Sequence, residues 1–251
     1  MRQPRLSGCL RRRTRATLSA PSLSTRTVRA IVVSDACTRS MKRSKSSQRW
    51  LQRQASDPYV RRSKADGYRS RAAYKLLEID HKDRLLRPGL CVIDLGAAPG
   101  GWTQVAARAV GRRGRVLALD LLAMAPIQGV DMITGDFHDE RVLTQALAWL
   151  DGGDRRGRAD LVLSDMAPNV SGTKAVDQPR STLLVELAMD FAEQTLKPGG
   201  SLVVKAFQGE GFDTTLRKLR GRFDKVVCRK PEASRSQSRE TYFVAKGFRV
   251  G

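Results

Sequence analysis

Three aspartates, Asp120, Asp136 and Asp165, stand at or just after the ends of short apolar runs in the middle of the chain. Each one alone is more often a helix cap or a turn residue than part of a binding site. If the runs are neighbouring parallel strands, however, their carboxyl ends meet at one edge of a sheet, where ligands of such folds bind. A row of carboxylates repels nucleotide phosphates, so it favours a ligand that carries hydroxyl groups, an amine and a positive charge.

A turn of small residues, Gly96–Trp102, lies between an apolar run and a helical stretch. Taken alone, it could be an ordinary strand-to-helix turn in which glycine supplies a positive φ. It lacks the GxGxxG spacing of dinucleotide sites and the GK[ST] ending of phosphate-binding loops, which disfavours NAD and ATP. Asp120 follows Gly96 by 24 residues, near the spacing at which an acid meets a ribose hydroxyl in related folds.

The turn and the three aspartates together predict a site for S-adenosylmethionine, whose ribose hydroxyls, amine and sulfonium have the required chemistry. We expect Asp120 to bind the ribose and Asp136 to lie near the adenine edge. Trp102 also has a simpler interpretation, as core filler at the start of a helix. The predicted cofactor-binding residues are Gly100, Trp102, Asp120, Asp136 and Asp165.

Lys205 follows the apolar run Leu202-Val203-Val204, and lysine is uncommon in such a strand. A lysine partly removed from water and set near another ammonium is driven toward its neutral form. It can then act as a base or stabilise an alkoxide. Two other candidates have simpler interpretations from the residues alone. Lys75 fits the solvated face of an amphipathic helix, and Glu240 fits a surface partner of a neighbouring arginine.

Short apolar runs alternate with amphipathic stretches from residue 91 onward, which predicts strands alternating with helices. Such alternation implies right-handed crossovers and helices on both faces of the sheet. The predicted fold class is therefore α/β, a doubly wound Rossmann-like domain with a mostly parallel seven-stranded sheet. The predicted strands are Cys91–Leu95, Val116–Asp120, Met132–Thr134, Leu161–Ser164, Ser201–Phe207, Lys225–Cys228 and Thr241–Ala245. The predicted helices are Trp102–Val110, Glu140–Leu150, Ser181–Leu196 and Asp213–Arg220.

Four motifs in this order along the chain resemble those of the FtsJ/RrmJ family of ribosomal RNA ribose 2′-O-methyltransferases. They are Asp94–Trp102, Asp165–Asn169, Val203–Lys205 and Ser238–Tyr242. The resemblance extends from about Met41 to the C-terminus, and the single catalytic domain is similar to the short bacterial form that acts on the large-subunit RNA. One departure is the Met124-Ala125-Pro126 turn, where the family is expected to have an acid before the proline.

The resemblance implies a catalytic Lys-Asp-Lys-Glu tetrad at Lys75, Asp165, Lys205 and Glu240. It also implies transfer of a methyl group from S-adenosylmethionine to the ribose 2′-hydroxyl of a uridine in large-subunit ribosomal RNA. This reaction is an in-line displacement, for which positioning supplies much of the rate. Lys205 would handle the hydroxyl proton, while Asp165 and Glu240 would hold the two ammonium groups. Asp165 would also lie beside the methyl donor.

The net charge of +21 is concentrated toward the N-terminus, where residues 1–75 carry 20 basic and 3 acidic side chains. Residues 76–251 carry 26 and 22, a nearly neutral balance. No run approaches the roughly 18 apolar residues of a membrane span. We therefore expect ribosomal RNA as the partner, no membrane, and a soluble chain. The expected phosphate contacts are Arg61, Arg62, Lys64, Arg69 and Arg71.

Composition divides the chain into a basic extension expected to be disordered, 1–40, a basic RNA-binding arm, 41–66, and the S-adenosylmethionine-dependent methyltransferase domain, 67–251. The extension has the composition of a mitochondrial transit peptide. It could equally be an upstream stretch read from a wrongly chosen start, because Met41 offers a second one. The resemblance to the short bacterial form favours the cytoplasm over the mitochondrion.

The four cysteines, Cys9, Cys37, Cys91 and Cys228, are scattered without a CxxC pair, and the chain has two histidines. We therefore expect no metal, no disulfide framework and a reducing compartment. We also expect a monomer. Two other functions stay open, an RNA-binding ribosome-assembly factor with a vestigial methyltransferase site, and a methyltransferase for small molecules or proteins. The filled tetrad argues against the first, and the basic segment argues against the second.

Overall fold

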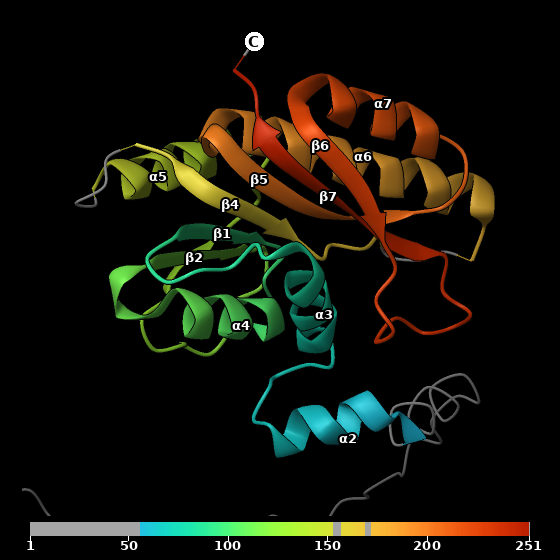
Figure 1. Ribbon diagram of the computed structural model, residues 1–251, viewed down its shortest axis with the longest axis horizontal. Coiled ribbons are helices and arrows are strands. Elements are labelled where there is room, and N and C mark those ends of the chain that lie inside the picture. The colour runs from blue at the N-terminus through green and yellow to red at the C-terminus, as the bar shows by residue number, and fades with distance from the viewer. Residues whose placement is uncertain (1–55, 153–156, 169–171, 251) are drawn as a thin grey trace, which may run out of the picture. The chain divides into compact units, whose positions relative to one another are not determined.

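The computed structural model describes residues 56–152, 157–168 and 172–250 of the 251-residue chain (Figure 1). The predicted extension 1–40, most of the predicted arm 41–66, and Asn169 of the second motif lie outside these residues. Within the part that is described, no helix is both long enough and apolar enough to cross a membrane.

Seven strands form one sheet in the order β3-β2-β1-β4-β5-β7-β6. The first five in this order are parallel to one another, and β7 runs antiparallel to both β5 and β6. This arrangement confirms the predicted mostly parallel seven-stranded sheet, and each predicted strand lies within an observed one. The strands are β1 Cys91–Leu95, β2 Arg115–Asp120, β3 Asp131–Thr134, β4 Ala159–Ser164, β5 Leu196–Phe207, β6 Phe223–Arg229 and β7 Glu240–Phe248.

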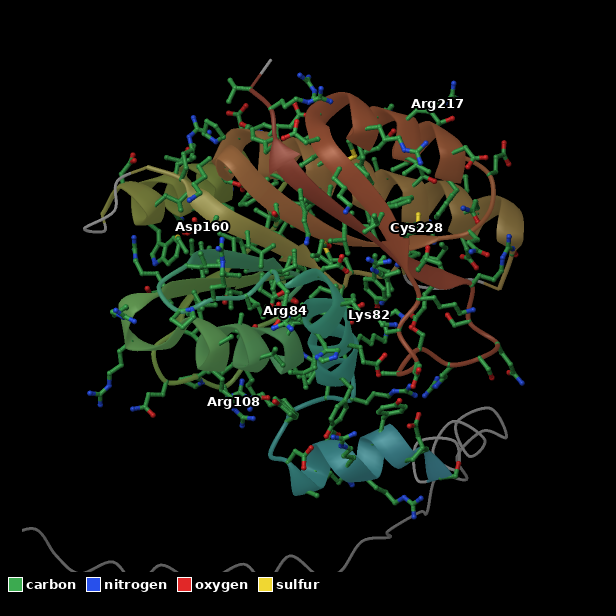
Figure 2. All side chains as sticks on the ribbon, viewed as in Figure 1. Lys82, Arg84, Arg108, Asp160, Arg217 and Cys228 are labelled. Carbon is green, nitrogen blue, oxygen red and sulfur yellow. The ribbon has the colours of Figure 1, made fainter. Side chains whose placement is uncertain are left out.

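Helices cover both faces of this sheet because successive side chains of its buried strands point to opposite faces. On β1, Val92 packs in a core with helices α3 and α4, whereas Ile93 packs in a second core with α5, α6 and α7 (Figure 1). Charged side chains such as Arg108 of α4 and Arg217 of α7 are exposed on the outer faces of these helices (Figure 2). The helices are α2 Pro58–Ala65, α3 Ala73–Asp83, α4 Gly101–Val110, the 3₁₀ turn η1 Gly111–Arg113, α5 Glu140–Asp151, α6 Lys174–Thr195 and α7 Phe212–Arg222.

Helix α6 begins at Lys174, earlier than the predicted start at Ser181. The observed helix contains Pro179, and a proline removes a backbone donor and usually ends or kinks a helix. The structure continues the helix through Pro179, and tertiary contacts hold this part in place. Gln178 Nε2 donates to the carbonyl oxygens of Phe207 at 3.3 Å and Glu210 at 3.0 Å. Helical propensity is therefore overridden here by contacts that the local sequence does not reveal.

Helix α2 was not among the predicted helices, although its start has a clear local signal. Asp57 caps the helix by accepting a hydrogen bond from the backbone of Tyr59 at 3.0 Å, and Pro58 occupies the first helical position. The Tyr59 ring lies 5.5 Å from the ring of Tyr74 on α3. The helix is thus attached to the domain through its first turn.

Candidate active site

The four predicted tetrad residues meet at the carboxyl ends of the central strands. Lys205 Nζ lies 2.7 Å from Asp165 Oδ1 and donates to the Asp165 carbonyl oxygen at 3.1 Å. Lys75 Nζ lies 2.9 Å from Glu240 Oε1. The two pairs are linked to each other, since Lys75 is 3.9 Å from Asp165 and Lys205 is 4.0 Å from Glu240. The structure therefore brings all four side chains into one cluster of two cations and two carboxylates.

Strand register accounts for three of these positions. The parallel pairing of β4 with β5 sets Ser164 opposite Val204, so Asp165 and Lys205 follow side by side. The antiparallel pairing of β5 with β7 then brings Glu240 opposite Phe207 at the same sheet edge. Lys75 comes from the first turn of α3, which packs against this part of the sheet.

Burial makes the pairing in this cluster necessary. Lys75 and Lys205 are each 8% exposed and Glu240 is 9% exposed. A charge so far removed from water is tolerated only when it is paired and hydrogen-bonded. Burial raises the pKa of Glu240, but the ammonium groups of Lys75 and Lys205 outweigh this effect and lower it below the usual glutamate value. Glu240 is thus held as a carboxylate that orients both lysines.

Tyr242 is a fifth member of the cluster, which the sequence analysis did not assign to the site. Its hydroxyl donates to Asp165 Oδ1 at 2.6 Å, and its ring lies 5.7 Å below Lys75 Nζ. Burial, followed by the Asp165 carboxylate, raises the pKa of Tyr242 well above its usual value. Its position two residues after Glu240 on the same strand, opposite Lys205, is the signal that could have identified it.

A cavity of about 330 Å³ opens beside Asp165, within the size range of small-molecule sites. It brings together the three aspartates predicted at the sheet edge, Asp120, Asp136 and Asp165. His138, which is paired with Asp136, and a set of apolar or small residues complete its walls, namely Gly96, Ala98, Leu121, Phe137, Met166, Ala167 and Leu184. Three strand-end carboxylates on a largely apolar wall suit a ligand with hydroxyl or amine groups and a planar ring.

Hydrogen bonds fix two of these carboxylates against the backbone. Asp120 accepts from the backbone of Ala98 at 2.8 Å and of Leu122 at 2.7 Å. Asp136 accepts from the backbone of His138 at 3.0 Å, and this bond is the largest cause of its lowered pKa. Both groups are therefore pre-oriented as acceptors at the cavity wall.

Gly100 and Trp102 do not line this cavity. Trp102 is 2% exposed, its ring lies 5.6 Å from that of Tyr242, and its indole N–H donates to the Ala72 carbonyl at 2.8 Å. Gly100 caps α4 with a φ of 108°. Gly96 occupies the wall instead, and a Cβ there would lie 2.3 Å from Cγ of Met166. The structure thus places Trp102 in the core behind the tetrad, in agreement with its simpler interpretation.

Asp94, near the end of β1, stabilises the glycine turn Gly96–Trp102, a role that was not predicted from the sequence. The residue is 1% exposed, and its Oδ2 accepts a hydrogen bond from the Thr103 hydroxyl at 2.6 Å. Burial raises the pKa of Asp94 to about 7. The hydrogen bond ties β1 to the first turn of α4, on either side of the glycine turn.

A second cavity, of about 310 Å³, opens on the other side of the tetrad. We call it the acceptor-side cavity, and its lining residues are Arg71, Ala72, Lys75, Arg235, Gln237, Ser238 and Glu240. Lys75 and Glu240 face this cavity. Asp165 faces the first cavity, which also contains Asp120 and Asp136 and which we call the aspartate-lined cavity. The tetrad therefore stands between two cavities of different charge, an arrangement that can bring two ligands together.

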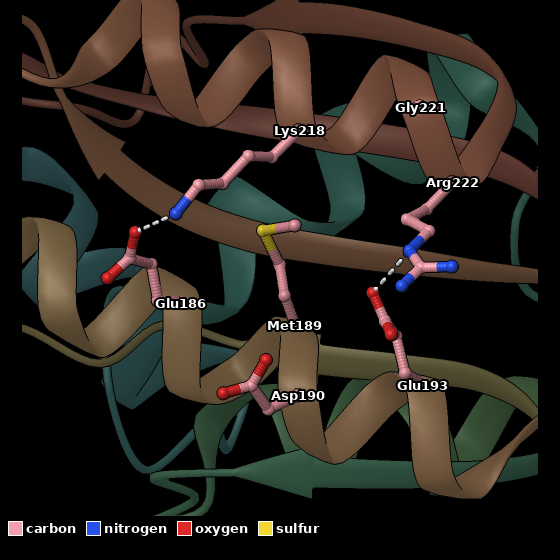
Figure 3. A pocket seen from close by; sticks show the side chains of 7 residues that line it. All are labelled: Glu186, Met189, Asp190, Glu193, Lys218, Gly221 and Arg222. Carbon is pink, nitrogen blue, oxygen red and sulfur yellow. Dashed lines mark hydrogen bonds and ion pairs between the residues drawn. The ribbon is translucent and has the colours of Figure 1, made fainter.

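A larger groove of about 490 Å³ lies between α6 and α7 (Figure 3). Four of its charged side chains form two ion pairs, Lys218 with Glu186 and Arg222 with Glu193, and Met189 lies between the pairs (Figure 3). It holds none of the predicted site residues. Volume alone therefore does not identify the active site of this chain.

The basic residues expected to contact phosphates are of two kinds. Arg61 and Lys64 on α2 are exposed and available to an anionic partner. Arg69 instead donates to the carbonyl oxygens of Pro99, Ala125 and Pro126, so it clamps the Met124-Ala125-Pro126 turn over the glycine turn. Arg62 lies 3.4 Å from Asp66, and Arg71 is paired with Asp57.

The chain matches the family model described as FtsJ-like methyltransferase over residues 68–248. It is 59% identical over 210 residues to the ribosomal RNA large subunit methyltransferase E of Marinobacter nauticus, covering 84% of this chain and 100% of the relative. The protein of the same name from Pseudomonas aeruginosa is 56% identical over 209 residues, with 83% and 99% covered. A solved ribosomal RNA methyltransferase from Plasmodium falciparum superposes with a TM-score of 0.65 at 32% identity, over 72% of this chain and 98% of that one.

Proposed function

The chain belongs to the FtsJ-like methyltransferase family, and from this premise we propose that it methylates the ribose 2′-hydroxyl of a nucleotide in large-subunit ribosomal RNA. The methyl donor we propose is S-adenosylmethionine. Support for the donor comes from the cavity lined by Asp120, Asp136 and Asp165. The named relatives support the RNA of the large subunit as acceptor.

The observation that carries this proposal is the position of the tetrad between two cavities. A methyl donor in the aspartate-lined cavity would be adjacent to Asp165. A ribose in the acceptor-side cavity would be adjacent to Lys75 and Glu240. Lys205 contacts Asp165 on one side and approaches Glu240 on the other. Lys205 therefore lies between the carboxylates that face the two cavities, which supports a role for it where the hydroxyl meets the methyl group.

When bound, S-adenosylmethionine supplies an electrophilic methyl carbon. The ribose oxygen would bond to that carbon as the carbon–sulfur bond breaks, and the hydroxyl proton would pass to a side chain of the tetrad. Lys75 and Lys205 would hold the oxygen in line and stabilise its developing negative charge. Lys205 Nζ lies 2.7 Å from Asp165 and 4.0 Å from Glu240, and this is the group that we propose handles the hydroxyl proton.

A methylation map of ribosomal RNA tests the proposed function. RNA from cells that lack this protein is expected to lose a single 2′-O-methyl group in the large subunit, and the wild-type chain is expected to restore it. Lys205→Ala should fail to restore the mark. If the map is unchanged without the protein, the proposed activity is wrong. If Lys205→Ala restores normal ribosome assembly, the alternative of an assembly factor with a vestigial site is favoured.

We further propose uridine as the acceptor base, following the motif resemblance, and a monomer as the active form. The two relatives with 56–59% identity are bacterial, and bacterial ribosomes are assembled in the cytoplasm, which supports a cytoplasmic location. Mass spectrometry of the native N-terminus would show whether residues 1–40 are retained, removed or never translated.

Asp120→Ala is expected to weaken binding of S-adenosylmethionine by about 10- to 150-fold, because losing a charged acceptor costs about 1.5–3 kcal/mol. Isothermal calorimetry with the purified chain measures this change directly. Asp131→Ala, on the neighbouring strand β3, is the matched control and should leave the affinity unchanged. An unchanged affinity in Asp120→Ala would remove this residue from the cofactor site.

A further inference from the structure

Asp57 is buried beneath the first turn of α2, with 9% of its side chain exposed. Its Oδ1 caps the helix, while its Oδ2 accepts a hydrogen bond from Arg71 Nη1. Arg235 Nε lies 3.8 Å from the same Oδ2. One carboxylate therefore faces two guanidinium groups, which come from segments more than 160 residues apart in the sequence.

The segment that carries Arg235 connects β6 to β7 and is held against α3. Glu78 accepts hydrogen bonds from the backbones of Glu232 and Ala233, the latter at 3.1 Å. Arg71 Nη2 donates to the Ala233 carbonyl. Residues 230–239 are thus fixed by contacts with α3 and with Arg71, immediately before Glu240 of the tetrad.

Both guanidinium groups that Asp57 faces line the acceptor-side cavity. The Arg71 side chain is 16% exposed, and that of Arg235 is 46% exposed. A planar guanidinium binds a phosphate by paired hydrogen bonds, but only when it is correctly oriented. A carboxylate behind the two groups can provide that orientation, in the way that buried acids hold ligand side chains at other sites.

We propose that Asp57 is a positioning residue for the RNA strand, which aligns Arg71 and Arg235 so that they bind the phosphates flanking the ribose in the acceptor-side cavity. This inference rests on the proposed function, because it takes RNA as the ligand of that cavity. It also gives α2 a role in the reaction. The helix start holds one wall of the cavity rather than serving only as part of a basic surface.

The sign of the expected effect separates this role from simple electrostatics. Removing a negative charge near a polyanion strengthens binding when only net charge matters. Asp57→Asn removes such a charge, and asparagine is as good a helix cap as aspartate, so α2 is expected to persist. If Asp57 positions the two arginines, the same variant must instead weaken RNA engagement.

The experiment measures methylation kinetics on undermethylated large ribosomal subunits for the wild type, Asp57→Asn and Asp139→Asn. Asp139→Asn is the matched control. Like Asp57, Asp139 caps a helix, here α5, by accepting from the Arg141 backbone, and it pairs with an arginine side chain, that of Arg141. Its substitution by asparagine removes the same charge. We expect Asp57→Asn to raise the KM for RNA about tenfold, the lower end of the cost of a lost charge-assisted hydrogen bond. The KM for S-adenosylmethionine and the kcat at saturating RNA should change less than about twofold. Asp139→Asn should leave the KM for RNA unchanged.

Arg235→Gln provides a second route to the same test, since Arg235 is half exposed and its loss does not threaten folding. It should also raise the KM for RNA and reduce the dependence of RNA binding on salt by about one unit of slope. Adding Asp57→Asn to Arg235→Gln should cost less than the sum of the two single changes. Thermal melting of each variant checks that the fold is intact.

An unchanged or lowered KM for RNA in Asp57→Asn would overturn the inference while leaving the proposed function in place, provided that the wild type methylates the particles. Loss of kcat together with unchanged KM values would also overturn it. Should the wild type prove inactive on ribosomal RNA, the proposed function fails. Titrations of Asp57→Asn with the same RNA then decide between weaker binding, which supports positioning, and tighter binding, which refutes it.

Discussion

Lys205→Ala is expected to abolish methyl transfer while leaving the affinity for S-adenosylmethionine nearly unchanged. Loss of proton transfer alone typically costs about 10²- to 10⁴-fold in rate, and loss of positioning adds to it. The cofactor affinity is expected to persist because Lys205 does not line the aspartate-lined cavity. Single-turnover methylation of ribosomal particles measures the rate, and calorimetry measures cofactor binding.

Removing a buried ammonium also leaves carboxylates without a partner, so the loss of rate must be separated from a loss of stability. Lys75 remains 3.9 Å from Asp165 and 2.9 Å from Glu240, which limits this effect. Lys246→Ala is the matched control. Like Lys205, Lys246 is a strand lysine that donates to a backbone carbonyl and lies beside the carboxylate of the same residue, here Asp83. It should retain full activity.

Lys205→Arg separates the two roles that the geometry allows. A guanidinium keeps the positive charge but does not release a proton near neutral pH. It is also larger, and the Lys205 side chain is only 7% exposed. We therefore expect Lys205→Arg to fail almost as badly as Lys205→Ala. Substantial activity would mean that only positive charge is needed there, and that water or another group accepts the proton.

The strands and the aspartates at their ends could be predicted because they depend on local sequence. A run of apolar residues buried on both faces defines a central parallel strand, and the residue that follows it lies at the sheet edge. Asp120 and Asp165 were found in this way, whereas Asp136 follows β3, an edge strand with no fully buried residue. Lys205 could be singled out too, since a lysine after three apolar strand residues is unusual.

Lys75 and Glu240 could not be identified from local sequence alone. Both have ordinary explanations there, as a helix surface and as a surface partner of arginine, so only the motif resemblance pointed to them. Their roles depend on the packing of α3 and on the antiparallel register of β7 with β5, which places Glu240 at the edge and Tyr242 opposite Lys205. Contacts between distant segments are what composition and periodicity do not encode.

Side-chain direction is the second limit of the sequence analysis. Trp102 ends the glycine turn in sequence, yet its side chain packs in the core. Arg69 lies close to the same turn in space, yet its guanidinium donates to backbone carbonyl oxygens. Arg71, expected to be a phosphate contact, lines the acceptor-side cavity, and there its guanidinium is held by Asp57. A basic or aromatic residue near a site can thus be part of its scaffold, and the hydrogen-bond partners decide which role it has.

Asp165→Asn is expected to lower both the methylation rate and the affinity for S-adenosylmethionine, unlike any change at Lys205. Asp165 Oδ1 accepts from Lys205 Nζ at 2.7 Å and from the Tyr242 hydroxyl at 2.6 Å, and the residue also lines the aspartate-lined cavity. Asparagine preserves the shape but removes the charge. Lys205 would then have Glu240, at 4.0 Å, as its nearest carboxylate.

Breaking one partner of a buried ion pair costs about 3–5 kcal/mol, which corresponds to about 10²- to 10³-fold or more if it falls on the transition state. The same assays as for Lys205 measure the rate and the cofactor affinity of Asp165→Asn. Tyr242→Phe is the informative control, because it removes the hydrogen bond to Asp165 and keeps the carboxylate. If Tyr242→Phe reproduces the full loss, the tyrosine hydroxyl, and not the charge of Asp165, aligns Lys205. If only the rate falls in Asp165→Asn, Asp165 serves the acceptor side alone, and the assignment of its carboxylate to the methyl donor is wrong.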